Sequence, residues 1–393
     1  MAENITILAV GGAGCRIMKE FVECGFDSGF RLLALDSDVD SLRDSGLPES
    51  SWIQAGKLWR SGHGCGGDAM AGQMAVANER KVIGPKLAGT KILIVIAGLG
   101  GGLASGGLPV IFGEAAKQHV TSVLLTTLPF AMEGYRRRKL ADERIAGDIL
   151  PVADAVIALP NDILFNTLDA EVPMAEAFRY SDRQMAQSLF AIGAILGGGN
   201  LFNADFAAFT GILKRRHTLC SLGVGVVDSN DAAAPETVVE KLLESPLLGG
   251  PEAFTTADAV AFTLLGGDDL SLGNSRAVLD LAVRQIDPHD EKEVLLGAAA
   301  TPGFAGKIQL TALVVRYLDN TPAETAHGGK RKTGNNRHFT AVSENSGHGE
   351  QLELLLNTAN KGIMENTFPV IIDGVDMDIP AYERHKIVLD LGK

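Results

Sequence analysis

The sequence predicts an α/β fold built on a doubly wound parallel sheet. Short, almost entirely apolar segments alternate with helical patterns through the first half of the chain, and a glycine-rich turn follows one of them. Apolar strands separated by helices indicate a parallel sheet that is covered on both faces. Ligands of such sheets bind at the carboxyl ends of the strands. The predicted strands are residues 4–10, 31–38, 91–98, 121–129 and 154–162, and the first predicted helix is residues 16–25.

The second half begins with a long apolar helix, residues 173–196, which the sequence GGGN ends. Apolar residues on several of its faces suggest a helix buried between two domains. Strands with interspersed helices follow, which indicates a smaller α+β domain. Its predicted strands are residues 218–227, 257–267, 293–300 and 307–318, and its predicted helices are residues 235–248 and 275–286.

Composition restricts the classes of function. The formal net charge is −13, from 35 Lys+Arg against 48 Asp+Glu, so we do not expect nucleic-acid binding, which needs a basic face. No run approaches the roughly 18 apolar residues of a membrane helix, and no signal-peptide pattern precedes the first strand. We therefore expect a cytoplasmic protein without direct membrane insertion. Because the four cysteines lie far apart without a CxxC pair, we expect no metal site formed by them.

The glycine-rich turn AGLGGGLASGG (residues 97–107) predicts an anion site, because glycine lets backbone N–H groups approach a phosphate at the start of a helix. A Walker-type P-loop is ruled out, since neither glycine loop ends in GK[ST]. A Rossmann NAD(P) site requires GxGxxG and an acid about twenty residues further on. The sequence GAGCRI supplies two of these glycines, Ile17 stands at the third position, and Asp36 is placed as the ribose-binding acid. This alternative stays open.

A series of segments in chain order resembles one known family. They are VGGAGCRI, LDSD, GHGCGGDAMAG, GLGGGLASGG at the position of a GGGTG[ST]G signature, TLPFAMEGYRRR at that of PFxFEGxxR, LPND, NADFAAF at that of a catalytic NxDxxD, ESPLL and DIPAYERHK. The chain resembles FtsZ, the bacterial relative of tubulin, over nearly its whole length. The resemblance implies a tubulin/FtsZ-like fold with a GTP-binding domain (1–173), a central helix (174–200), a second α+β domain (201–318), a flexible linker (319–365) and a C-terminal docking segment (366–393).

The resemblance also implies the bound nucleotide, GTP or GDP, with any Mg²⁺ held mainly by phosphates and water. In this family pattern the glycine loops wrap the phosphates with backbone N–H groups, and Asn161, Phe178 and Asp182 hold the guanine. Glu133 accepts from the ribose hydroxyls, and Arg137 pairs with ribose or phosphate. The implied nucleotide-binding residues are Gly11, Gly12, Gly14, Cys15, Arg16, Asp36, Asp38, Gly64, Cys65, Gly66, Gly98, Gly100, Gly101, Gly102, Leu103, Ala104, Ser105, Gly106, Pro129, Glu133, Arg137, Asn161, Phe178 and Asp182.

The phosphate loop departs from the family pattern. Leu103 replaces a threonine and so removes a hydroxyl, and Ala104 replaces a glycine. A methyl group at that position is costly if the backbone φ is positive, as the family glycine suggests. Arg16 stands where the first loop usually has asparagine, and either adds positive charge or crowds the base.

The NADFAAF segment departs further. In the family this loop of one subunit reaches the nucleotide of the next, where two acids orient and polarise the attacking water. Asn203 and Asp205 match the catalytic pattern, while Ala208 stands at the second acid. A methyl group can neither accept a proton nor orient water. We therefore expect nucleotide binding with weak or absent hydrolysis.

The carboxyl terminus keeps the acidic–Ile–Pro–aromatic–basic pattern of the family's partner-docking peptide. This implies docking to a division or membrane-tether protein, and the alternatives are an edge strand or a tail without function. The implied docking residues are Asp378, Ile379, Pro380, Tyr382 and Arg384.

Three functional hypotheses follow from these patterns. The first is a GTP/GDP-binding, FtsZ-like cytoskeletal protein that assembles head to tail as a homopolymer and acts in bacterial cell division, septation or related scaffolding. The second is a guanine-nucleotide-locked structural or regulatory paralogue that does not hydrolyse GTP. The third, which leaves most of the motifs unexplained, is a Rossmann-like NAD(P)-binding enzyme.

Overall fold

The computed structural model describes residues 4–26, 29–57, 64–162, 168, 171–196, 200–202, 206–214, 218–231, 233–286, 292–300, 304–318, 371–372 and 375–376. The chain divides into two compact units, Met1–Gly329 and Lys330–Lys393. The predicted linker lies outside the described residues. Within the second unit, the described residues form one antiparallel pair, β12 (Ile371–Ile372) with β13 (Val375–Asp376).

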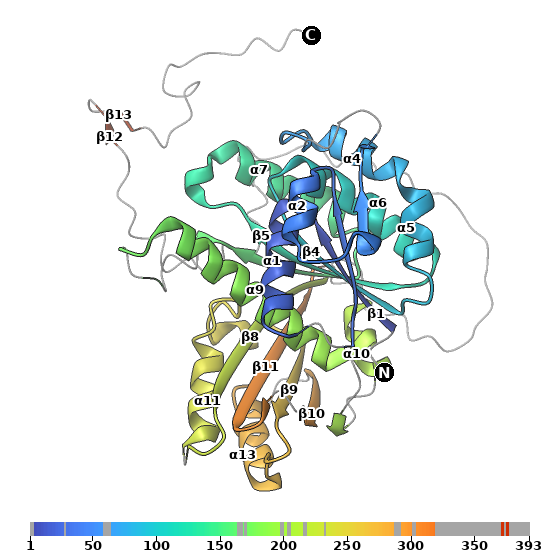
Figure 1. Ribbon diagram of the computed structural model, residues 1–393. Coiled ribbons are helices and arrows are strands. Elements are labelled where there is room, and N and C mark those ends of the chain that lie inside the picture. The colour runs from blue at the N-terminus through green and yellow to red at the C-terminus, as the bar shows by residue number, and fades with distance from the viewer. Residues whose placement is uncertain are drawn as a thin grey trace, which may run out of the picture. The chain divides into compact units, whose positions relative to one another are not determined.

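The amino-terminal half of the first unit forms the predicted parallel sheet (Figure 1). Its strands lie in the order β3-β2-β1-β4-β5-β6, and each neighbouring pair is parallel. The apolar runs become fully buried strands, which is why they show no polar alternation. The strands are β1 (Ile5–Val10), β2 (Arg31–Asp36), β3 (Trp52–Gln54), β4 (Ile92–Gly98), β5 (Thr121–Leu128) and β6 (Ala155–Pro160).

Helices connect these strands and cover the sheet (Figure 1). Two of them begin with a side-chain cap, since Asp38 accepts from the N–H of Asp40 and Asp68 from those of Met70 and Ala71. The helical segments are α1 (Gly11–Glu23), α2 (Val39–Asp44), η2 (Glu49–Ser51), α4 (Ala69–Asn78), α5 (Arg80–Lys86), α6 (Gly102–Lys117), η3 (Ala131–Glu133), α7 (Tyr135–Arg144) and a π-helical turn, η4 (Ile145–Ile149).

The predicted long helix is α9 (Met174–Leu196), which packs beside α1. After it come β7 (Asn200–Phe202) and α10 (Phe206–Leu213). Phe21 of α1, Met185 of α9 and Phe209 of α10 belong to one buried core together with side chains of β1 and β4. The long helix therefore joins the parallel sheet to the second half of the chain, as its apolar faces predict.

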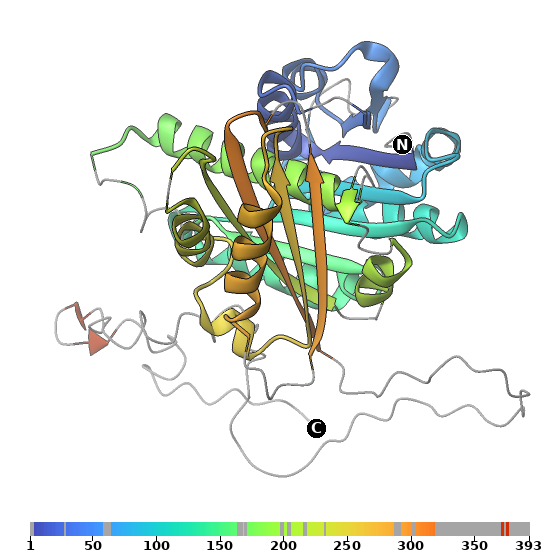
Figure 2. The same ribbon diagram turned by 90° about the horizontal axis from the view of Figure 1, so that it is seen from below.

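The second half has the predicted mixture of strands and helices. β11 pairs antiparallel with β8 and β9, and β10 pairs parallel with β9. The helices α11 and α13 lie side by side on one face of these strands (Figures 1 and 2). The elements are β8 (Thr218–Asp228), α11 (Ala234–Leu243), α12 (Glu252–Thr255), β9 (Ala259–Gly266), α13 (Leu272–Val283), β10 (Glu293–Ala300) and β11 (Lys307–Tyr317).

A parallel contact between β6 and β8 joins the two groups of strands. Val156 pairs with Leu219 and Ile157 with Cys220. The result is one 11-stranded sheet in which β8 follows β6. The first half of this sheet is parallel throughout, so the carboxyl ends of its strands form a single edge, and that edge carries the site described next.

Candidate nucleotide site

A cavity of about 360 Å³ lies at the carboxyl ends of the parallel strands. This volume is within the usual range of small-molecule pockets. Gly11 and Gly12 follow β1, Asp36 ends β2, Gly98 ends β4 and Asn161 follows β6, and all of them line the cavity. The site is therefore at the edge where the parallel sheet predicts a ligand.

Two helices begin at the cavity. The first-turn N–H groups of a helix have no acceptor within the helix, and they carry the positive end of its dipole. Gly11 and Gly12 open α1, and Gly101 and Gly102 open α6, so both sets of N–H groups lie in the wall of the cavity. Gly11 has a φ of +76° and Gly100 a φ of +93°, which favours glycine at these two positions. This wall suits phosphate groups.

Ser105 has a structural role in the phosphate loop. Its hydroxyl accepts a hydrogen bond from the backbone N–H of Gly100 at 3.2 Å, and Ser105 is fully buried and does not line the cavity. The N–H of Gly100 is therefore already bonded within the loop. Among the three loop glycines, Gly101 and Gly102 keep N–H groups that are placed for a ligand.

The two residues of this loop that differ from the family pattern are buried, and the backbone strain expected at Ala104 is absent. Leu103 and Ala104 are 5% and 3% exposed and lie in the first turn of α6. Among the described residues, His119 is the one non-glycine residue with a positive φ. Ala104 therefore has ordinary backbone geometry, and the expectation of a costly methyl group was wrong because the helix begins before this residue.

Three predicted residues serve packing and do not line the cavity. A Cβ at Gly14 would lie 2.5 Å from the carbonyl oxygen of Ile96, so glycine lets α1 approach β4. A Cβ at Gly106 would overlap the carbonyl oxygen of Ala69, where α6 touches α4. Cys15 is fully buried, and burial raises the pKa of its thiol, so it is a neutral core side chain.

A third part of the wall combines a glycine turn with two acids. Gly64, Cys65 and Gly66 line the cavity, and the Cys65 thiol lies 3.5 Å from the Ser37 hydroxyl. Asp36 is buried and accepts hydrogen bonds from the backbone N–H groups of Ser37 at 2.6 Å and Asp38 at 3.1 Å. Burial raises the pKa of the Asp36 carboxyl, and the backbone hydrogen bonds oppose this rise.

The raised pKa gives a prediction for Asp36→Asn. A carboxyl whose pKa is higher in the folded state contributes stability at low pH that is lost as the pH rises from its unfolded pKa, about 4, through its folded pKa. Both backbone N–H groups bond one oxygen of Asp36, which an asparagine keeps. We therefore expect the free energy of unfolding of Asp36→Asn, relative to the original chain, to rise between pH 4 and pH 7. Urea unfolding across this range measures it, and a difference independent of pH would contradict it.

Another part of the wall contains an ion pair. Glu133 accepts from the backbone N–H of Phe130 at 2.9 Å through one oxygen and from Arg137 at 2.8 Å through the other. Pro129, Glu133 and Arg137 all line the cavity. Both carboxylate oxygens of Glu133 thus already accept a bond, and Arg137 is partly neutralised by its neighbour.

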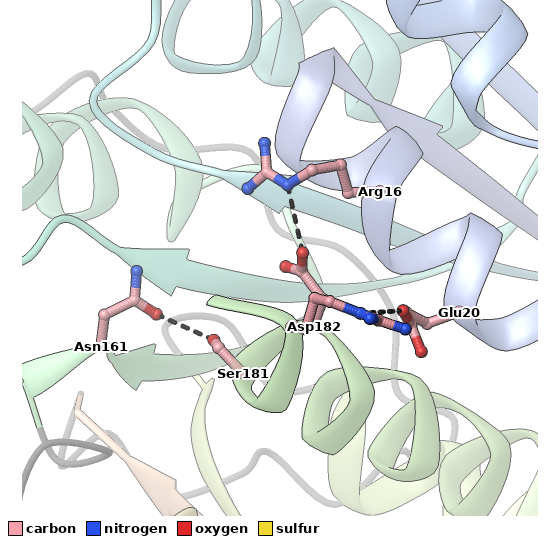
Figure 3. A network of polar contacts seen from close by, with 6 residues as sticks. Arg16, Glu20, Asn161, Ser181 and Asp182 are labelled. Carbon is pink, nitrogen blue, oxygen red and sulfur yellow. Dashed lines mark hydrogen bonds and ion pairs between the residues drawn. The ribbon is translucent and has the colours of Figure 1, made fainter. Parts of the chain in front are cut away.

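The remaining wall is suited to a flat base. Phe178, at the start of α9, is half-buried and packs edge-on against Phe130 with ring centroids 5.0 Å apart. Asn161 is buried, with its side-chain oxygen 3.4 Å from the Ser181 hydroxyl. Arg16 of α1 also lines the cavity, and its Nε donates to Asp182 of α9 at 3.1 Å (Figure 3). Asp182 itself does not line the cavity.

Most of the predicted nucleotide-binding residues converge on this cavity. The exceptions are Gly14, Cys15, Ser105, Gly106 and Asp182. Some lining residues were not predicted, and most of them are sequence neighbours of the motifs. They are Ala13, Ser41, Gly67, Leu99, Thr127 and Leu128. Ser41, on α2, had no signal beyond its place after LDSD.

The predicted catalytic and docking residues are not in the part of the chain that the structure describes. Asn203 and Asp205 lie outside the described residues, and so do Asp378, Ile379, Pro380, Tyr382 and Arg384. Ala208 is described, and it is a half-buried residue of α10.

The helix α10 lies at the opposite edge of the sheet from the cavity. The Tyr317 hydroxyl donates to the carbonyl oxygen of Ile212 in α10 at 3.1 Å, and Tyr317 pairs with the first residue of β8. The next residue of β8, Leu219, pairs with Val156 near the amino end of β6. The cavity is at the carboxyl end of β6. Ala208 is thus far from the cavity of its own chain.

The described residues contain no group of three or more His, Cys, Asp or Glu side chains that could hold a metal ion. No helix among them is long and apolar enough to cross a membrane.

Comparison with known proteins shows what the chain is similar to. Residues 4–169 match the family described as Tubulin/FtsZ family, GTPase domain. The chain is 29% identical over 329 residues to cell division protein FtsZ 1 of Pyrococcus furiosus, covering 82% of this chain and 85% of that protein. It is 29% identical over 327 residues to the FtsZ 1 of Pyrococcus horikoshii, covering 81% and 84%.

Solved structures share the fold. An empty FtsZ dimer of M. jannaschii superposes with a TM-score of 0.70 at 23% identity, over 84% of this chain and 95% of that one. A GTPγS-bound protofilament of CetZ2 from Haloferax volcanii superposes with a TM-score of 0.65 at 21% identity, over 81% and 94%.

The fold and the site define a GTPase-domain protein of the tubulin/FtsZ class. Residues 4–169 match the GTPase domain of that class, and together the comparisons support a divergent FtsZ-like member of the tubulin superfamily. The family and the fold class predicted from the motifs are thereby confirmed.

Proposed function

We propose that this protein binds GTP or GDP in the cavity and assembles head to tail into filaments through it. The observation that best supports the proposal is that α1 and α6 both begin at the cavity, at the carboxyl ends of the strands of a tubulin/FtsZ-type sheet. Exposed first-turn N–H groups and dipoles at one point favour a polyphosphate.

Each wall then has a role in nucleotide binding. The N–H groups of Gly11 and Gly12 and those of Gly101 and Gly102 hold the phosphates, and the Glu133–Arg137 pair contacts the ribose. The Phe178 ring covers the base. The cavity wall has three acids. Asp36 is buried, Asp38 caps α2, and Glu133 is paired with Arg137. Mg²⁺, if bound, is therefore held mainly by phosphates and water, where it would neutralise phosphate charge.

The separation of Ala208 from the cavity supports a nucleotide held between subunits. Ala208 lies toward the amino ends of the strands, so it would meet a nucleotide only when a second copy stacks on the first. Such a contact is heterologous and does not close, which produces filaments. Two of the similar solved structures are titled as an FtsZ dimer and a CetZ2 protofilament.

Hydrolysis is weakened in this proposal, and the physiological task is cell division or related scaffolding. Ala208 leaves the subunit contact without one carboxylate, and Leu103 brings no hydroxyl to the phosphate loop. The same observations favour the second candidate, a paralogue locked to guanine nucleotide. The docking segment would bind a division or membrane-tether protein in the cytoplasm.

One experiment tests the proposal and separates the candidates. The purified chain is incubated with GTP, GDP or NAD, and bound nucleotide, released phosphate and light scattering are measured together. We expect guanine-nucleotide binding, scattering that depends on it and phosphate release that is slow for this family. Scattering with no phosphate release supports the locked paralogue. Retention of NAD without guanine nucleotide would overturn both in favour of a Rossmann-like enzyme.

A further inference from the structure

A ladder of ion pairs connects α1 to α9 beside the part of the cavity wall that is suited to a flat base. Arg16 and Glu20 lie one turn apart on α1. Arg16 pairs with Asp182 (Figure 3). Glu20 lies 3.7 Å from Arg179 and 3.5 Å from Arg183. Opposite charges thus face each other along both helices, and the bond to Asp182 orients the Arg16 side chain.

The two partners of the first pair differ in their access to the cavity. The Arg16 side chain is 51% exposed and lines the cavity, whereas the Asp182 side chain is 9% exposed and does not. The bond to Asp182 uses Nε, and no other polar contact of Arg16 occurs among the described residues. In Figure 3 the dashed line to Asp182 starts at Nε, and none starts at either terminal nitrogen. They remain free to donate to a ligand.

The place of Arg16 matches the base end of a nucleotide. Phosphates belong at the N-terminus of α1, and Arg16 is five residues along this helix, a rise of about 7.5 Å. The half-buried Phe178 ring and the buried Asn161 amide line the cavity with it. An aromatic face, an amide and a guanidinium form a wall for a flat heterocycle with hydrogen-bond acceptors.

We propose that Arg16 reads the base through two acceptors, O6 and N7 of a 6-oxopurine, and that Asp182 is a positioning residue for Arg16 that does not touch the base. This inference rests on the proposed function, purine-nucleotide binding. It replaces the expectation from the family pattern that Asp182 holds the guanine. The ligand class becomes nucleotides of guanine and hypoxanthine alike.

The chemistry of arginine selects this edge. A guanidinium has donors in a fixed fork and no acceptor, and it matches the paired O6 and N7 acceptors of guanine. Hypoxanthine offers the same pair. Adenine has an amino group in place of O6, so it would set a hydrogen-bond donor against the donors of the guanidinium. The 2-amino group, which distinguishes guanine from hypoxanthine, is on the other side of the base, out of reach of this fork.

Equilibrium binding of four diphosphates to the full chain tests the proposal. We expect IDP to bind within about threefold of GDP, because the 2-amino group is not read. We expect 7-deaza-GDP, which lacks the N7 acceptor, and ADP each to bind about tenfold or more weaker, the usual effect of losing a hydrogen bond to a charged group. IDP binding tenfold or more weaker than GDP, with 7-deaza-GDP unaffected, would overturn the proposal. If none of the four bound, the proposed function itself would fail.

Variants test separately whether Arg16 contacts the base and whether Asp182 positions Arg16. Arg16→Asn removes the fork and frees Asp182, so we expect the 7-deaza penalty to disappear and IDP to become weaker than GDP. Asp182→Asn weakens the hold on Arg16, and we expect GDP and IDP to weaken together while the 7-deaza penalty shrinks. Arg183→Gln is the control, since it breaks a contact of the same ladder outside the cavity wall and leaves all ratios unchanged. Because each readout is a ratio of affinities, a general loss of stability does not produce the result. Unchanged ratios in Arg16→Asn would overturn the proposal.

Discussion

Gly106→Ala is expected to destabilise the fold by about 3 kcal/mol, the upper range for an overpacked core. A Cβ at this position would overlap the carbonyl oxygen of Ala69 and come 2.7 Å from the backbone nitrogen of Gln73. Both are backbone atoms of α4, so no flexible side chain can move aside. The two helices must separate. Since α6 begins at the phosphate wall, nucleotide affinity should fall with stability.

Gly113→Ala is the matched control in the same helix. A Cβ at Gly113 meets no atom within 4 Å. Alanine is the better helix former, so this change should stabilise the chain by about 0.5–1 kcal/mol. Urea unfolding of the two variants beside the original chain measures the opposite signs. Equal effects at the two positions would show that α4 and α6 do not meet as described.

The contact between α4 and α6 also explains why the separate roles of these glycines could not be predicted from the sequence. The signature AGLGGGLASGG predicts an anion site from its glycine content. Only the fold separates these glycines by role, with Gly101 and Gly102 opening α6 at the cavity and Gly106 passing the backbone of α4. That division depends on a helix crossing between distant segments, which no local pattern in one sequence encodes.

The strands were predictable for a physical reason. Buried parallel strands must be apolar on both faces, so runs such as KILIVIAG mark β4 and its neighbours directly. The turns after them then placed the site at one sheet edge. By contrast, the backbone of Ala104 depended on where α6 begins, and the replacement of asparagine by Arg16 left charge and crowding as equal alternatives. The structure adds a partner that no local pattern indicates, because Asp182, 166 residues away, accepts from Arg16.

Ala208→Asp is expected to raise GTP turnover at least about tenfold, since a positioned general base or water-orienting acid contributes factors of about 10² to 10⁴. Ala208 is a half-buried residue of α10 at the amino edge of the sheet. An aspartate there restores the second acid of the family pattern at the surface that a neighbouring copy would meet. Phosphate release per chain, measured above the concentration at which scattering appears, gives the effect.

Ala208→Asn is the control for this change, because it has nearly the same shape without a carboxylate. It should leave turnover close to that of the original chain. If Ala208→Asp scatters light as the original chain does and still releases no more phosphate, the missing acid is not what limits hydrolysis.

The concentration dependence of the gain tests the arrangement behind it. The chain that supplies residue 208 cannot supply it to its own cavity, because α10 and the cavity lie at opposite ends of β6. Turnover per chain of Ala208→Asp should therefore rise steeply with protein concentration and level off once every cavity has a neighbour. A gain that was the same at all concentrations would place the acid and the nucleotide in one chain, which the sheet does not allow. The new carboxylate would thus report on assembly and on chemistry in a single measurement.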